Sequence, residues 1–186
     1  SLLISKVRED NINPNDKDNA PGSVKEAMQK YLDVPNGDIY QLDAKQVAKL
    51  ADSCGGVVVT GDLTNPTYAF FDMGEGQEPE NFPTTFCGLS ESNKLDIFFV
   101  QGKFCAGGLG ALRFAKNGLQ LFISRRSPKL NEANASNDIG FTVTRKFPAG
   151  NSRRNPPFKY LVIDGKIPSF PATPLKILPK LNSAKP

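Results

Sequence analysis

The chain has 186 residues, of which 39% are hydrophobic, and a net charge of +4 from 23 basic and 19 acidic side chains. This length suits one domain with a single core, and the mild charge does not by itself indicate nucleic-acid binding. Histidine does not occur, which excludes Ser-His-Asp and Cys-His catalysis and histidine metal sites.

The cysteines and the hydropathy pattern indicate the cellular compartment that suits this chain. The three cysteines form no C-x-x-C pair, so the sequence predicts neither a disulfide framework nor a zinc site. No apolar run approaches the roughly 18 residues of a membrane span, and no signal peptide opens the chain. We therefore expect a soluble, cytoplasmic protein without a membrane partner.

Helices are expected in the first third of the chain. Residues 1–7 are apolar enough to be the end of a helix, and residues 8–22 have the Asn, Asp and Pro content of a loop. Two later segments open with a capping box, in which the capping side chain is followed three residues later by Glu or Gln. These pairs are Ser23 with Glu26 and Asp43 with Gln46. A turn at 35–38 is expected between the two helices.

Runs of β-branched and aromatic residues predict strands near 57–61, 67–72, 119–124, 139–147 and 158–163. The turn Asn65-Pro66 makes the first two neighbours, and the turn Asp164-Gly165 follows the last. Helices followed by strands indicate an α+β fold. We expect a two-layer sandwich with helices on one face of a mixed, mainly antiparallel sheet.

The remaining intervals have weaker signals. Residues 78–106 show no clean period and are predicted to be a long functional loop with a short helix near 83–89. A helix is expected over 110–116. From Pro168 onward the prolines are dense, so we expect one domain over 1–167 and a Pro-rich tail or linker over 168–186.

A D-x-G-x-G motif follows the second predicted strand, with Asp72, Gly74 and Gly76 at its fixed positions. A carboxylate there can accept a hydrogen bond from the exocyclic amine of adenine, while the glycines let the backbone pass close to a flat ring. A tight turn capped by the aspartate accounts for the isolated motif equally well.

A second glycine-rich segment leads into the helix expected after it. Lys103 precedes Gly107, Gly108, Leu109 and Gly110, and exposed amides at a helix start form a phosphate site to which a lysine adds charge. Glycine-rich flexibility is the plainer interpretation. The segment is no Walker A loop, because Phe104 stands where that motif requires Ser or Thr.

The order and spacing of the two motifs resemble the GHKL superfamily of gyrase, heat-shock chaperones, histidine kinases and MutL, whose ATP-binding domain has the Bergerat fold. The resemblance covers roughly residues 56–147. It implies that Asp72, with Gly74 and Gly76, reads adenine, and that Lys103 and the Gly107–Gly110 loop hold the phosphates. Ser92-Asn93-Lys94 resembles the lid of MutL-like members, which adds Lys94 to the nucleotide site. Residues 140–143 loosely resemble the later G-T strand and would place Thr142 under the adenine.

One motif of the family is not found on a predicted helix. Its catalytic Glu and magnesium-binding Asn occupy an E-x-x-x-N helix, whereas Glu26 is followed four residues later by Lys30. Glu9 and Asn13 have the E-x-x-x-N spacing but fall in the interval 8–22 expected to be a loop. Either that helix lies upstream of Ser1 in a longer parent or it is lost, and we expect the first. The chain then has no catalytic residue and no metal ligand of its own, and Mg is expected only in the parent, together with ATP.

The resemblance implies ATP binding by an ATPase domain whose lid closure is a switch for further domains of the parent, with a homodimer as one form of output. ATP hydrolysis would need the missing Glu. An alternative is a non-catalytic interaction module that retains a degenerate GHKL fold and binds protein or nucleic acid through the basic residues 145–154. A histidine-kinase activity would need a partner domain, since this chain has no histidine to phosphorylate.

Overall fold

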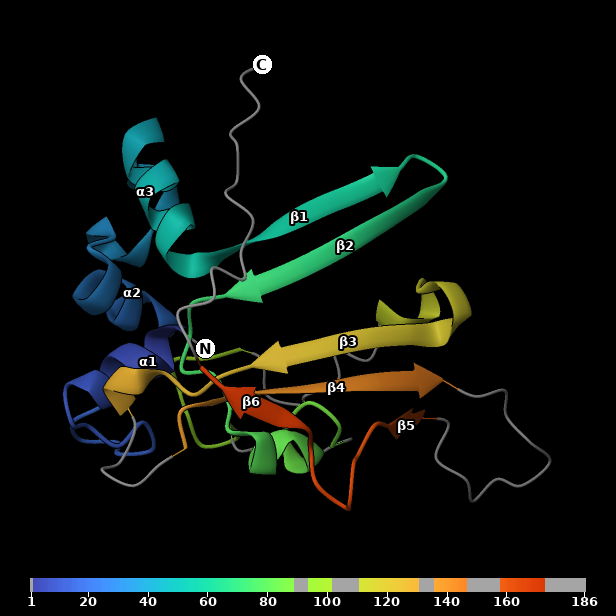
Figure 1. Cartoon of the computed structure of the whole chain (residues 1–186). Helices are drawn as coiled ribbons and strands as arrows, with labels where there is room; N and C mark the ends of the chain where they lie inside the picture. The colour runs from blue at the N-terminus through green and yellow to red at the C-terminus, as the bar shows by residue number, and fades with distance from the viewer. Residues whose placement is uncertain (1, 89–93, 102–110, 131–135, 147–157, 173–186) are drawn as a thin grey trace.

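The computed structural model describes residues 2–88, 94–101, 111–130, 136–146 and 158–172 (Figure 1). Its α-helices are α1 (Leu2–Glu9), α2 (Val24–Leu32) and α3 (Ala44–Cys54). Its strands are β1 (Gly55–Asp62), β2 (Asn65–Asp72), β3 (Leu119–Ser124), β4 (Asp138–Lys146), β5 (Phe158–Tyr160) and β6 (Ser169–Pro171). Short 3₁₀ helices are η1 (Pro35–Gly37), η2 (Ile39–Gln41), η3 (Pro79–Thr84), η4 (Ala111–Arg113), η5 (Lys116–Gly118) and η6 (Pro128–Leu130).

Both predicted helix starts are confirmed. The carboxylate of Asp43 accepts a hydrogen bond from the amide of Gln46 at 2.8 Å, and the Gln46 side chain accepts one from the Asp43 amide at 2.9 Å. At α2 the Ser23 hydroxyl accepts from the Glu26 amide, but the Glu26 carboxylate accepts from Gly22 instead of Ser23. Over the described ranges, none of the helices combines the length and apolarity needed to cross a bilayer.

The helix expected over 110–116 is wrong for the part that the structure describes. Residues 111–113 form the single 3₁₀ turn η4, and another such turn, η5, follows. Asn117 and Gly118 both have positive φ angles of 61°, a left-handed conformation that ends a helix. The chain therefore enters β3 directly from a turn.

Within the described ranges the strands form two antiparallel sheets instead of the single expected sheet. β1 and β2 pair along their whole length as a hairpin, from Gly55 opposite Asp72 to Asp62 opposite Asn65. In the other sheet β4 pairs with β3, β5 and β6. The α+β class with antiparallel strands is confirmed. The strand predicted over 158–163 is shorter, and Ser169–Pro171 adds a strand inside the expected tail.

The main core lies where α1 and α2 pack on residues 97–99. It contains Ile4, Val7, Ala27, Ile97 and Phe99, all at most 3% exposed. The interval expected to be a functional loop thus supplies core residues. Since burial of such large side chains is strongly favourable, Ile97 and Phe99 contribute to the stability of the fold.

A second aromatic cluster covers one face of β3 and β4. Phe82 of η3 is fully buried, meets Phe86 edge-on with ring centroids 5.0 Å apart, and lies against Gly140 of β4. Phe86 in turn stacks on Phe122 of β3 at 5.3 Å. The short helix predicted near 83–89 is wrong for the part that the structure describes, because the 3₁₀ helix η3 ends at Thr84 and residues 85–88 are not helical. η3 packs against the sheet where α-helices were expected.

Candidate functional site

The D-x-G-x-G motif lies where the hairpin leaves β2 and turns toward the second sheet. Asp72 is the last residue of β2, opposite Gly55, and its side chain is exposed. Its Oδ1 accepts a hydrogen bond from the amide of Gly74 at 2.8 Å. Among the described residues no hydrogen bond reaches its Oδ2. The carboxylate is therefore fixed by one oxygen and presents the other to solvent.

Gly76 is required by the conformation of this turn. Its φ is +63°, and a Cβ at this position would overlap the carbonyl oxygen of Arg125. Only glycine tolerates both the left-handed conformation and the close approach. The turn is thereby held against the segment that follows β3.

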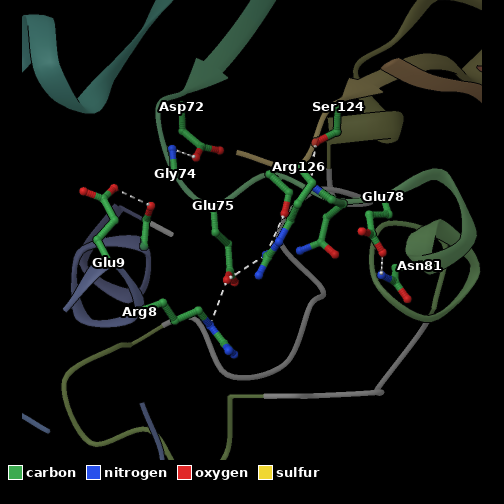
Figure 2. A network of polar contacts seen from close by, with 12 residues as sticks. Arg8, Glu9, Asp72, Gly74, Glu75, Glu78, Asn81, Ser124 and Arg126 are labelled. Carbon is green, nitrogen blue, oxygen red and sulfur yellow. Dashed lines mark hydrogen bonds and ion pairs between the residues drawn. The ribbon is translucent and has the colours of Figure 1, made fainter. Parts of the chain in front are cut away.

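The acidic residue inside the motif, Glu75, is the centre of a charged network (Figure 2). Its Oε2 lies 3.0 Å from Nη1 of Arg126 and 3.2 Å from Nε of Arg8. The Glu75 side chain is only 11% exposed, and a buried carboxylate needs such partners. A second pair of contacts lies beside it, where Glu9 of α1 contacts Lys6 of the same helix at 3.2 Å and Lys129 of η6 at 3.6 Å.

Main-chain contacts tie the same turn to β3. The amide of Gln77 donates to Oγ of Ser124 at 3.0 Å, and the amide of Ser127 donates to the carbonyl of Glu75 at 2.8 Å. At the other end of β2, Lys116 donates to the side chain of Asn65 at 3.1 Å. β2 and β3 consequently run side by side in the same direction, as Figure 1 shows, without forming one sheet.

Thr142 lies in the middle of β4, opposite Phe122 of β3. Its side chain is fully buried, and its hydroxyl donates to the carbonyl of Leu161 at 2.8 Å. The hydroxyl is thus engaged within the sheet, and the structure records no contact between Thr142 and Asp72. Lys94 is half-buried in a turn before the core segment, where its carbonyl accepts from the amide of Ile97.

The predicted phosphate site lies outside the described residues. It comprises Lys103, Gly107, Gly108, Leu109 and Gly110. The described part of the chain contains no group of three side chains able to hold a metal ion.

Sequence reasoning missed the residues that hold the motif. Arg8 falls in the interval predicted as a loop, although α1 extends to Glu9, and the sequence motifs assign no role to Arg126. A signal was present: an acidic residue stands inside a glycine turn, and an arginine doublet directly follows the strand over 119–124. Comparison of the chain with protein-family models, curated proteins and solved structures gives no match.

Proposed function

We propose that this chain binds the adenine base of ATP at the end of β2, with Asp72 as the residue that reads the base. The main support for this proposal is the environment of the Asp72 carboxylate. It is exposed, it is oriented by the hydrogen bond from the Gly74 amide, and its second oxygen accepts no hydrogen bond from a described residue. An acceptor-only group in a fixed position recognises an amine donor. The adjoining backbone at Gly74 and Gly76 has no side chains to obstruct a flat ring.

The rest of the nucleotide site follows the resemblance to the GHKL superfamily. In this proposal Lys103 and the loop Gly107–Gly110 hold the phosphates, and Lys94 completes the site. Thr142 is assigned no contact with the nucleotide, because its hydroxyl is buried and donates to the carbonyl of Leu161. Because Phe82, Ile97 and Phe99 are core residues, any lid over the nucleotide consists of other parts of 78–106. The finer fold assignment, a Bergerat sandwich in a cytoplasmic parent with further domains, belongs to the same proposal.

The described residues do not provide a site for magnesium. They contain no cluster of three Asp, Glu, His or Cys side chains. The pair with E-x-x-x-N spacing, Glu9 and Asn13, does not lie on one helix, because α1 ends at Glu9. We therefore assign to this chain nucleotide binding without hydrolysis, and we assign no residue to the metal.

Titration calorimetry with ATP and GTP tests the proposal. GTP carries a carbonyl where adenine carries its amine, so the wild type prefers ATP. Asp72→Asn keeps the acceptor for the Gly74 amide but adds donors, and it costs about 1.5–3 kcal/mol of ATP binding, roughly 10- to 150-fold in affinity. Loss of the preference for ATP over GTP accompanies this change.

The matched control is Asp62→Asn. Asp62 also ends a strand of the hairpin, is exposed, and accepts hydrogen bonds from the amides of Thr64 and Asn65 at 2.8 Å. This variant keeps wild-type ATP affinity. If Asp72→Asn binds ATP as the wild type does and retains the same ATP-to-GTP ratio, Asp72 is only a turn residue.

A second candidate function, association with another copy of this chain, is favoured by the outer face of β3 and β4. Cross-strand pairs share a face, so Leu121 with Val143 and Ile123 with Phe141 lie on one side of the sheet. The other side contains Thr142 and Thr144, which are buried. In most strands the apolar side chains face the core and the polar side chains face solvent, but here the order is reversed. The exposed side chains are apolar, with Leu119, Leu121 and Ile123 at 45%, 56% and 49% exposure. Apolar faces of this kind mark interaction surfaces.

Sedimentation velocity over a range of concentrations tests this candidate. The wild type dimerises as its concentration rises, and Leu121→Ser weakens the dimer. Leu63→Ser is the control, because Leu63 is fully exposed in the turn between β1 and β2 and is not a residue of β3 or β4. A wild type that stays monomeric at every concentration, or equal dimerisation of the two variants, excludes the outer face as a dimer interface.

A further inference from the structure

The contacts of Glu75 differ in kind from those of Asp72, although both residues belong to one turn. Asp72 is exposed, whereas the side chain of Glu75 is 11% exposed and points from the turn toward Arg8, away from Asp72 (Figure 2). Both guanidinium groups approach the same oxygen, Oε2, at 3.0 and 3.2 Å. Glu75 therefore binds parts of the protein and has no oxygen directed at the proposed base site.

Arg126 contacts two residues of the turn. Its Nη1 contacts the Glu75 carboxylate and also donates to the carbonyl of Gly76 at 3.5 Å, a longer and weaker contact. The neighbouring residues add main-chain contacts, since Ser127 donates to the carbonyl of Glu75 and Gly76 packs on Arg125. The segment after β3 thus fixes the turn through side chain and backbone together.

Arg8 connects the same carboxylate to α1. It lies on the last turn of that helix, whose residues Ile4 and Val7 are buried in the main core. Arg8 therefore links the Glu75 carboxylate to the main core through α1, and Arg126 links it to the second sheet. A site held by charged hydrogen bonds to rigid elements keeps its geometry within narrow limits.

We infer that Glu75 is a positioning residue, which with Arg126 and Arg8 fixes the turn so that the Asp72 carboxylate meets the amine of adenine. The inference rests on the proposed nucleotide function. It makes the preference for ATP over GTP depend on residues that do not touch the nucleotide. Arg126 contributes more than Arg8, because its side chain is 21% exposed against 44% for Arg8, and exposed ion pairs are weak.

The test is the ATP-to-GTP affinity ratio of Glu75→Gln and Arg126→Gln, measured by calorimetry at a temperature where circular dichroism shows each variant to be folded. A loss of stability alone lowers the affinity for both nucleotides equally, whereas misplacement of Asp72 lowers the affinity for ATP selectively. We expect the ratio to fall by roughly tenfold, the scale on which supporting hydrogen bonds act at other sites. Because both variants break the contact between Glu75 and Arg126, the double variant loses less than the product of the two single losses.

Two further variants keep the test informative. Glu9→Gln is the matched control, because Glu9 is also an ion-paired carboxylate next to Arg8, but its partners among the described residues are Lys6, Lys129 and Ser5. It leaves the ratio unchanged. Arg126→Lys keeps the charge without the planar donor group and restores part of the ratio lost in Arg126→Gln. This conservative variant also serves if Glu75→Gln does not fold.

The outcomes separate the two levels of the proposal. If the wild type does not bind ATP, the nucleotide function fails, and the positioning role fails with it. If the wild type prefers ATP and Asp72→Asn loses that preference, the nucleotide function stands. In that case an unchanged ratio in Arg126→Gln and in folded Glu75→Gln overturns the positioning role alone.

Discussion

Replacement of Gly76 by alanine is the sharpest perturbation of the turn on which the account depends. An alanine there must adopt φ near +63°, which costs about 1–2 kcal/mol in an L-residue. Its Cβ also overlaps the carbonyl of Arg125, so the turn must move. Movement breaks the hydrogen bonds from Gln77 to Ser124 and from Ser127 to Glu75, each worth about 1 kcal/mol. The total is about 3–4 kcal/mol.

Gly165→Ala is the matched control for this prediction. Gly165 has a similar φ of +75°, but no atom lies within 4 Å of the position that its Cβ would take. The alanine there costs only the conformational term, about 1–2 kcal/mol. Urea unfolding of the wild type and both variants gives the two free energies. Equal losses within about 0.5 kcal/mol would show that the contact between the turn and Arg125 does not restrain Gly76.

Further predictions concern a helix cap, a thiol and a carboxylate. Asp43→Ala removes the capping box of α3 and lowers the free energy of unfolding by about 1 kcal/mol in urea titrations. Burial raises the pKa of the Cys87 thiol to about 11, so about one thiol in a thousand is ionised at pH 8. Because the thiolate is the nucleophile, alkylation of Cys87, followed by peptide mass spectrometry, is slow at this pH and accelerates tenfold per pH unit up to that pKa. Burial raises the pKa of Glu9, but the hydrogen bond and charge of Lys6 and the charge of Lys129 outweigh it and bring the pKa below 4.5. The stabilisation from Glu9 is therefore complete above pH 4.5 and is lost as the pH falls through the folded-state pKa, so thermal melts of Glu9→Gln and wild type differ at pH 7 and converge in acid.

Local signals in the sequence predicted the local elements well. The capping boxes at Ser23 and Asp43 predicted where α2 and α3 begin, because a cap is a contact between residues three apart. The β-branched runs predicted β1 to β4, and the turn at Asp164-Gly165 is present, with both residues at positive φ. These features depend on neighbours in the chain.

Features that depend on distant residues were not predictable in the same way. The division into two sheets depends on pairing between strands, and the core role of Ile97 and Phe99 depends on α1 and α2, far away in the sequence. Similarly, the D-x-G-x-G pattern identified a turn, but not the partners of Glu75 at positions 8 and 126. The sequence names candidate residues, while their roles follow from contacts across the fold.

The central claim, that the turn after β2 receives adenine, is tested most directly by nuclear Overhauser contacts between ATP and the isotope-labelled protein. Because the Asp72 carboxylate would accept from the exocyclic amine, the adenine ring must lie over the backbone of the turn. The account predicts contacts from the adenine H2 proton to the amide protons of Gly74 and Gly76 at saturating ATP. Contacts that map to another part of the chain, or their absence at saturation, would contradict it.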